Sequence, residues 1–315
     1  MGAPLMAESL SGIHGRIAYY SQGAIYSINA DGSNLLHLTS GEGGAWPSWS
    51  PDGSRITFAG GPIDNTNIYI MHSDGSNFIK LSAAGGTAPF WSPKGDWIAY
   101  TPAQVNNDAI YIINTNGSDV RLLTTEGGYE GVWSPDGMHI AYPCGKQICI
   151  VNVDGSGSQH LTTKGGQSPA WSSDGSRIAF TSESNIYVTN TDGSQVTQIT
   201  NGQGKFQTPS WSPDGNHIAF IGKTSSLFDA SDPLGYRVYI MKTDGSQMTP
   251  LTNPQVVEPI GRPAWSPDGS LIAFTASLAG KRGGSTNIYL AKIDGSAMTQ
   301  LSENANSPVW QPEQP

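Results

Sequence analysis

One pattern of residues recurs along the chain and constrains its fold more than any other feature. It reads approximately W-S-P-D-G-x-R-I-A-F, followed by N-I-Y-I, D-G-S and L-T. The pattern occurs seven times, with its tryptophans at Trp49, Trp91, Trp133, Trp171, Trp211, Trp265 and Trp310. One copy is too small to bury its own apolar face, so neighbouring copies must stack. A repeat of roughly 40 residues that carries several short strands is typical of a β-propeller.

The copy around residues 46–60 shows how one unit is built. An extended segment ends at Trp49, and residues 50–53 predict a tight turn, because Pro51 presets φ and Gly53 accepts a left-handed conformation. Residues 55–58 then alternate as a strand. A further strand precedes the Asp-Gly turn at residues 74–75, and a short final strand follows it. Each unit is therefore predicted to hold four antiparallel strands, named a to d.

The ends of the chain predict how the ring closes. The first recognisable element is a strand b at residues 16–20, and the last is a strand a at residues 307–310. We therefore predict an all-β fold: a seven-bladed β-propeller of four-stranded antiparallel blades, closed by pairing of the C-terminal strand with the N-terminal blade. Such closure leaves no free sheet edge at the seam. The expected boundaries are a flexible lead-in at 1–14, one propeller at 15–311 and a tail at 312–315.

Charge and hydropathy exclude several classes of partner. The net charge is −9, and only 13% of the residues are charged, which argues against nucleic acid and anionic membrane as partners. No apolar run approaches the length of a transmembrane helix, so membrane insertion is not expected. The first residues, MGAPLMAESLSG, lack the basic start and apolar centre of a signal peptide.

The consensus W-S-P-D-G-S-R-I-A-F followed by I-Y-I-M-K-T-D-G-S resembles the TolB-type β-propeller repeat. Close copies lie at residues 171–180, 211–220 and 265–274, and the resemblance extends from about residue 15 to 311. It implies the propeller fold and an extracytoplasmic location, periplasmic or at the cell surface. Similar repeats occur in periplasmic TolB, in peptidase propellers, in oligogalacturonate lyases and in sensor regions of bacterial kinases. The resemblance therefore leaves the function open.

The seven copies also serve as an internal control, because a residue that occupies a repeat position is explained by the fold. Eleven aspartates fall in the a–b and c–d turns, where the carboxylate caps its own backbone. They are Asp31, Asp52, Asp74, Asp136, Asp154, Asp174, Asp192, Asp214, Asp244, Asp268 and Asp294. Five histidines occupy repeat positions in the same way: His37, His72, His139, His160 and His217. No metal-ligand spacing emerges, and we predict no catalytic residue, no metal and no cofactor.

Two cysteines interrupt the pattern in the fourth blade. Cys149 replaces the tyrosine of I-Y-I, and Cys144 lies five residues earlier, across a predicted hairpin. By analogy with Phe180 and Tyr187 in the next blade, Cys149 should face Tyr142, which places the two thiols diagonally. That arrangement allows a disulfide without favouring it, so the bonding of the pair stays open.

Loop lengths distinguish the two faces of the predicted ring. The a–b and c–d turns on one face are short and uniform, whereas the b–c and d–a loops on the other face vary. Residues 221–237 and 277–286 form long b–c loops, and 252–262 form a long d–a loop. Binding usually lies on such variable loops. The predicted rim residues are Phe228, Asp229, Asp232, Tyr236, Arg237, Lys281 and Arg282.

The innermost strands carry the remaining departures from the repeat, where each strand a begins at the channel mouth. The predicted ligand-binding residues are Trp46, Tyr129, Glu130, Gln167, Gln207, Arg262 and Asn306. Aromatic and polar side chains around a mouth suit a sugar, a peptide end or a small ligand. The alternative is that the charged members are solvated or paired and bind nothing.

Three functions follow from these features. The first is a monomeric, non-enzymatic module that binds a protein, a peptide, or a small-molecule or glycan ligand. The second is an extracytoplasmic sensor or scaffold domain of a larger receptor. The third is a carbohydrate-active lyase or hydrolase with Glu130 as acid or base, which would require a second carboxylate or a metal.

Overall fold

The chain folds as a ring of seven four-stranded antiparallel sheets in a computed structural model, which confirms the predicted fold class. The structure describes residues 14–40, 43–62, 66–82, 85–103, 109–125, 127–129, 131–163, 165–224, 235–279 and 285–313. These residues contain no helix, and accordingly none that is long and apolar enough to cross a membrane. The predicted lead-in at 1–14 lies almost entirely outside the described residues.

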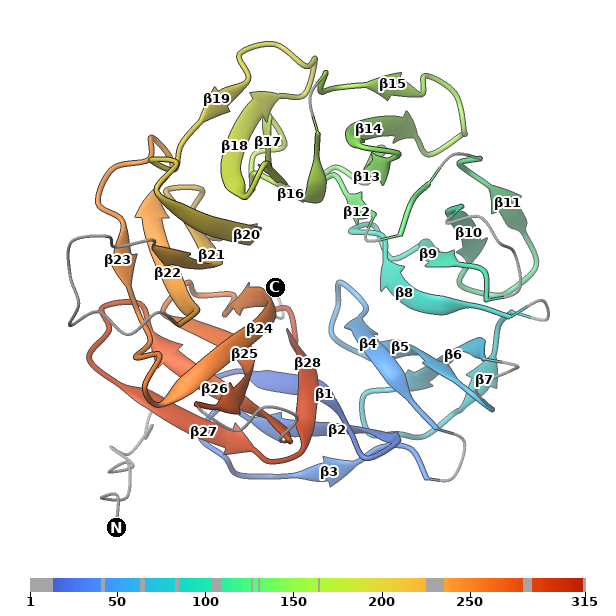
Figure 1. Cartoon of the computed structure of the whole chain (residues 1–315). Coiled ribbons are helices and arrows are strands. Elements are labelled where there is room, and N and C mark those ends of the chain that lie inside the picture. Colours follow the sequence, from blue (N-terminus) through green and yellow to red (C-terminus); the bar gives the residue numbers. More distant parts are fainter. Residues whose placement is uncertain are drawn as a thin grey trace.

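The strands follow the same spatial order in every blade, from the channel outward (Figure 1). Blade 1 holds β28 (Ala305–Trp310), β1 (Arg16–Ser21), β2 (Ala24–Asn29) and β3 (Leu36–His37). Blade 2 holds β4 (Ala45–Trp49), β5 (Arg55–Gly60), β6 (Asn67–His72) and β7 (Ile79–Lys80). Blade 3 holds β8 (Thr87–Trp91), β9 (Trp97–Thr101), β10 (Tyr111–Asn114) and β11 (Val120–Leu122).

The remaining four blades continue the series around the ring. Blade 4 holds β12 (Val132–Trp133), β13 (His139–Cys144), β14 (Gln147–Asn152) and β15 (Gln159–His160). Blade 5 holds β16 (Gln167–Trp171), β17 (Arg177–Ser182), β18 (Asn185–Asn190) and β19 (Thr197–Gln198). Blade 6 holds β20 (Gly204–Trp211), β21 (His217–Thr224), β22 (Arg237–Lys242) and β23 (Thr249–Pro250). Blade 7 holds β24 (Val257–Trp265), β25 (Leu271–Leu278), β26 (Thr286–Lys292) and β27 (Met298–Ser302).

The apolar core lies between the blades, because each sheet is covered by a neighbour on both faces. In blade 5, Ile178, Ala179 and Phe180 are at most 1% exposed although they are consecutive in strand β17. Phe180 lies directly opposite Tyr187, and their rings stack with centroids 5.6 Å apart. The outer strand β19 is exposed and contributes little to this core.

The ring closes as the sequence predicts. Strand β28 pairs antiparallel with β1, with Trp310 opposite Ile17 and Ala305 opposite Ser21. The last strand therefore supplies the innermost strand of the blade that the first strands begin.

Hydrogen bonds from the repeated tryptophans join six of the seven blades to the preceding one. Trp211 Nε1 donates to the carbonyl of Ala170 at 3.0 Å, and Trp265 Nε1 donates to the carbonyl of Ser210 at 3.0 Å. Four further indoles make the equivalent bond at 3.1–3.3 Å: Trp49, Trp133, Trp171 and Trp310. Trp310 donates to blade 7, so the same bond supports the seam. Among the described residues, the buried Nε1 of Trp91 is the exception and has no hydrogen-bond partner.

Deletion of residues 304–315 should strongly destabilise the fold. It removes β28, exposes the edge of β1 and takes away Trp310, and loss of one buried tryptophan alone costs about 3–5 kcal/mol. We expect the melting temperature to fall by roughly 10 °C or more, measured by circular dichroism. Deletion of residues 312–315, which follow the last strand, is the control. An unchanged melting temperature in the longer deletion would contradict closure by β28.

Candidate binding site at the channel mouth

The innermost strands begin with an unusual backbone conformation around the channel. In blades 2, 3, 5 and 6 the pairing of strand a shifts register at a bulge immediately before its centre. A non-glycine residue with φ between 47° and 56° lies at this place in five blades, and each precedes a proline: Trp46, Ala88, Ser168, Thr208 and Ser307. Left-handed non-glycine residues are costly, but this one recurs in five blades and is therefore a feature of the repeat.

Blade 7 differs from the others at this point. Gly261, with φ of 77°, takes the left-handed conformation, and Arg262 is an additional residue between it and the proline. Three residues of β24 are therefore bulged between the paired positions Ile260 and Ala264, against two in blade 2. In the sequence, Arg262 and Trp46 both directly precede the proline of strand a. In the structure, however, the left-handed conformation of Trp46 is taken in blade 7 by Gly261, and the bulge contains one more residue.

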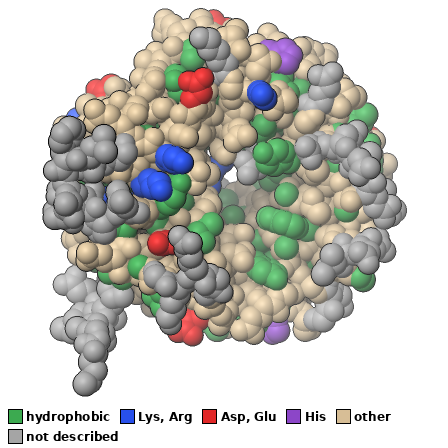
Figure 2. All heavy atoms as spheres, in the orientation of Figure 1, with side chains coloured by type: hydrophobic (Ala, Val, Ile, Leu, Met, Phe, Trp, Pro, Cys, Tyr) green, Lys and Arg blue, Asp and Glu red, His purple; other side chains and the backbone are tan. Residues whose placement is uncertain are grey.

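An apolar recess opens between blades 1, 2, 3 and 7 at this mouth. Its volume is about 560 Å³, and its walls include Trp46, Phe90, Ile260, Arg262 and Asn306. The prolines of four inner strands complete the lining: Pro47, Pro89, Pro263 and Pro308. Trp46 is 46% exposed and Ile260 is 49% exposed, so large apolar side chains face solvent there. Figure 2 shows hydrophobic side chains gathered beside the central opening.

A second, more polar recess lies between blades 4, 5 and 6. It has a volume of about 420 Å³, and Gln167, Gln207, Lys205 and Tyr236 line it. The ammonium group of Lys223 lies 5.1 Å from the centre of the Tyr236 ring, a cation–π arrangement. The two predicted glutamines therefore belong to a different recess from Trp46, Arg262 and Asn306.

The other predicted site residues line neither recess or lie outside the described part of the chain. Tyr129 is described and is 44% exposed, but it lines neither recess. Arg237 Nη1 lies 3.4 Å from the hydroxyl of Tyr239 in the same strand, to which it donates. The remaining predicted residues lie outside the described part of the chain: Glu130, Phe228, Asp229, Asp232, Lys281 and Arg282.

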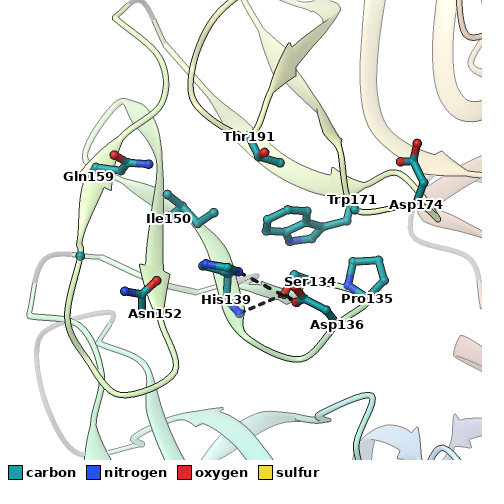
Figure 3. A pocket seen from close by; sticks show the side chains of 12 residues that line it. Ser134, Pro135, Asp136, His139, Ile150, Asn152, Gln159, Trp171, Asp174 and Thr191 are labelled. Carbon is teal, nitrogen blue, oxygen red and sulfur yellow. Dashed lines mark hydrogen bonds and ion pairs between the residues drawn. The ribbon is translucent and has the colours of Figure 1, made fainter.

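A serine, an aspartate and a histidine meet in a recess of about 320 Å³ on the turn face, between blades 4 and 5 (Figure 3). Ser134 Oγ donates to Asp136 Oδ1 at 2.5 Å and accepts a bond from the backbone N–H of His139 at 2.9 Å. In a hydrolytic triad the histidine lies between the serine and the acid. Here the serine bonds the acid directly, as Ser212 does with Asp214 in blade 6, so the arrangement is part of the repeat.

All eleven aspartates of the repeated turns have a pKa below the ordinary value. Asp174 shows the cause. Its Oδ1 accepts bonds from Ser172 Oγ at 2.6 Å and from the backbone N–H of Ser176 at 3.0 Å, and these bonds lower its pKa to about 2. Each carboxylate is held charged by its own turn, which confirms the structural role inferred from the repeat.

The structure joins Cys144 and Cys149 in a disulfide, which the sequence left open. Cys149 lies opposite Tyr142, as predicted, and Cys144 lies opposite Gln147. The Cα atoms of the two cysteines are 5.8 Å apart, within the range a disulfide requires. His160, opposite Cys149 in β15, completes a cluster that the sequence analysis did not identify.

Comparison with known proteins agrees with the propeller fold. The model of the TolB beta propeller domain matches residues 3–167 and 148–314. The chain belongs to this family. No curated protein matches the chain at a significant level. This TolB-family propeller shares its fold with solved structures of different activities.

TolB from Acinetobacter baumannii is 18% identical, with a TM-score of 0.61 over 95% of this chain and 67% of that one. An oligogalacturonate lyase from Vibrio parahaemolyticus is 14% identical, with a TM-score of 0.65 over 92% of this chain and 85% of that one. Hydrazine synthase from Kuenenia stuttgartiensis is 17% identical, with a TM-score of 0.60 over 82% and 79% of the two chains. At these identities the likeness establishes the fold alone.

The lowered aspartate pKa values predict a loss of stability in acid. Because the folded pKa lies below that of the unfolded chain, the stabilisation is complete above about pH 4 and is lost as the pH falls towards about 2. Asp174→Ala should reduce the free energy of unfolding by roughly 1 kcal/mol at pH 7, allowing for solvent screening. The difference from the unmodified chain should shrink between pH 4 and pH 2 in urea titrations. Glu258→Ala, which removes a carboxylate outside these turns, is the control, and a difference for Asp174→Ala that does not change with pH would contradict the assignment.

Proposed function

We propose that this TolB-family propeller is a non-enzymatic binding module that holds an apolar segment of a protein or peptide partner at its channel mouth. The observation that carries the proposal is the apolar recess beside the channel, where Trp46 and Ile260 are about half exposed. Exposed apolar surface that forms a concave site usually marks a place of interaction. The backbone of Trp46 is held in a left-handed conformation at the bulge, immediately before Pro47.

The chemistry of the recess favours a peptide over a charged ligand. Proline rings and an indole present rigid apolar surface with little side-chain entropy to lose on binding. Arg262 and Asn306 at the same mouth supply polar groups that orient a partner's backbone or a terminal carboxylate. None of the described residues that line this recess is acidic, whereas glycosidic bond cleavage by acid–base chemistry uses a pair of carboxylates.

The proposed location is extracytoplasmic. It rests on the family likeness to TolB and on the disulfide in blade 4, since disulfides persist mainly in oxidising compartments. A role as a sensor or scaffold domain of a larger receptor would use the same mouth, with the partner segment as its signal.

Selection from a displayed library of random peptides tests the proposal directly. We expect selected peptides to be rich in aromatic and aliphatic residues and to compete for one site. Trp46→Ala should weaken their binding at least tenfold, which corresponds to about 1.4 kcal/mol. The variant should fold, because Ala88 holds the equivalent left-handed position in the next blade with φ of 47°.

Ile79→Ser is the matched control, since Ile79 is also 49% exposed but lies on the outer strand β7. Its peptide binding should equal that of the unmodified chain. Equal binding by Trp46→Ala, or an equal loss in both variants, would reject the channel-mouth site. Cleavage of a polysaccharide that disappears in Glu130→Gln would favour the carbohydrate-active alternative.

A further inference from the structure

Three potential metal ligands converge on strands β13, β14 and β15 of blade 4, away from the channel-mouth recess. His160 Nδ1 lies 3.2 Å from Cys149 Sγ and 3.6 Å from Cys144 Sγ. The three ligand atoms all lie within 4.8 Å of one another. Both cysteines are at least 95% buried, whereas His160 is exposed. The two sulfur atoms of the cluster therefore lie inside the protein, and the histidine is accessible to solvent.

Comparison with the other blades shows that the two sulfurs are the departure from the repeat. In blade 1, His37 occupies the position of His160 and lies opposite Tyr26, and their rings stack with centroids 4.5 Å apart. In blade 4 that tyrosine is replaced by Cys149, and the serine that ends strand b in blades 1 and 5 is replaced by Cys144. A histidine that elsewhere covers an aromatic ring therefore faces two sulfur atoms.

We propose that Cys144, Cys149 and His160 form a redox-gated site for Zn²⁺, closed in the disulfide form and open after reduction. Two thiolates and one imidazole are ligands that this cation prefers, and three protein ligands leave a fourth position for water. The disulfide is the resting form in an oxidising compartment. Metal binding then reports exposure of the protein to a thiol reductant.

One dithiol molecule is sufficient to reduce the disulfide and open the site. The dithiol supplies two electrons and two protons, the bond between Cys144 Sγ and Cys149 Sγ breaks, each sulfur takes one proton, and the reductant becomes a cyclic disulfide. Zn²⁺ then displaces both thiol protons to solvent. It binds the two thiolates and the Nδ1 atom of neutral His160.

The backbone around the site does not depend on the disulfide. Strands β13 and β14 pair continuously from His139 opposite Asn152 to Cys144 opposite Gln147, and β15 is anchored by the pairing of Cys149 with His160. These ladder bonds keep the three ligand positions on one face of the sheet when the sulfur–sulfur bond is broken.

Zinc binding by the full chain tests the proposal. The chain is reduced with a phosphine, which is consumed as phosphine oxide, and is titrated with Zn²⁺ in competition with a chromophoric chelator. We expect one ion per chain after reduction and none in the oxidised form. Titration of the reduced chain with Co²⁺ should give a thiolate-to-metal charge-transfer band, a signature that a surface carboxylate site does not produce.

Matched variants separate this site from adventitious binding. The double variant Cys144→Ser/Cys149→Ser should lose the ion, and His160→Gln, which keeps both cysteines, should weaken binding at least tenfold. His37→Gln changes the equivalent histidine of blade 1 and should bind like the unmodified chain. Equal zinc binding by the reduced chain and the double variant, or the same loss in His37→Gln as in His160→Gln, would overturn the proposal.

Discussion

The contact between each repeated tryptophan and the preceding blade is the interaction on which the rest of the structure depends. The indole packs between two sheets, and in all but Trp91 it donates its N–H to a carbonyl of the neighbouring inner strand, as Trp211 does to Ala170. A single blade cannot bury its apolar faces, so stability comes from these seven interfaces. Arginines reinforce two of them: Arg55 lies over Trp91 and Arg177 over Trp211, each at 4.9 Å. Closure through β28 makes the series continuous and leaves no terminal blade with an open face.

Because the tryptophans fix the inner strands at one end, the other end of each strand is free to vary. There the bulges hold residues such as Trp46 in left-handed conformations, and blade 7 adds Arg262 behind Gly261. The rigid ring orients these side chains around the channel, which is the arrangement a preorganised binding site requires. Blade 4 also departs from the repeat, on its central strands β13 and β14, where Cys144 and Cys149 replace the serine and the tyrosine of other blades and form a disulfide.

Features that depend on residues close together in the sequence were predictable. Turn residues and strand alternation predict the blades, and the aspartates of the turns behave as their Asp-Gly context implies. The register that places Cys149 opposite Tyr142 also follows from the neighbouring blade. Contacts between strands were harder to predict. The pairing of β14 with β15 brings His160 next to the cysteines. The equivalent pair in blade 1, Tyr26 opposite His37, would have predicted this contact if the two blades had been aligned.

The channel mouth also could not be fully resolved from sequence. The predicted residues divide between two recesses, because Gln167 and Gln207 belong to blades 5 and 6 whereas Trp46 belongs to blade 2. The shift of Arg262 depends on which residue adopts the left-handed conformation, and the glycine at position 261 was the available sequence signal, because glycine takes this conformation most readily. Exposure of Ile260, which did not enter the sequence analysis, follows the alternation of buried and exposed residues along β24, as it does for Gln207 in β20.

The most direct test of the account compares two tryptophans in urea unfolding. Trp91 and Trp211 are 6% and 8% exposed and lie under equivalent arginines, but only Trp211 donates an indole hydrogen bond. Replacement by phenylalanine removes similar volume at both sites. Trp211→Phe should therefore lower the free energy of unfolding by about 1–3 kcal/mol more than Trp91→Phe, because it leaves the carbonyl of Ala170 without its donor. Equal losses, or a larger loss for Trp91→Phe, would contradict the role of the indole bond between blades.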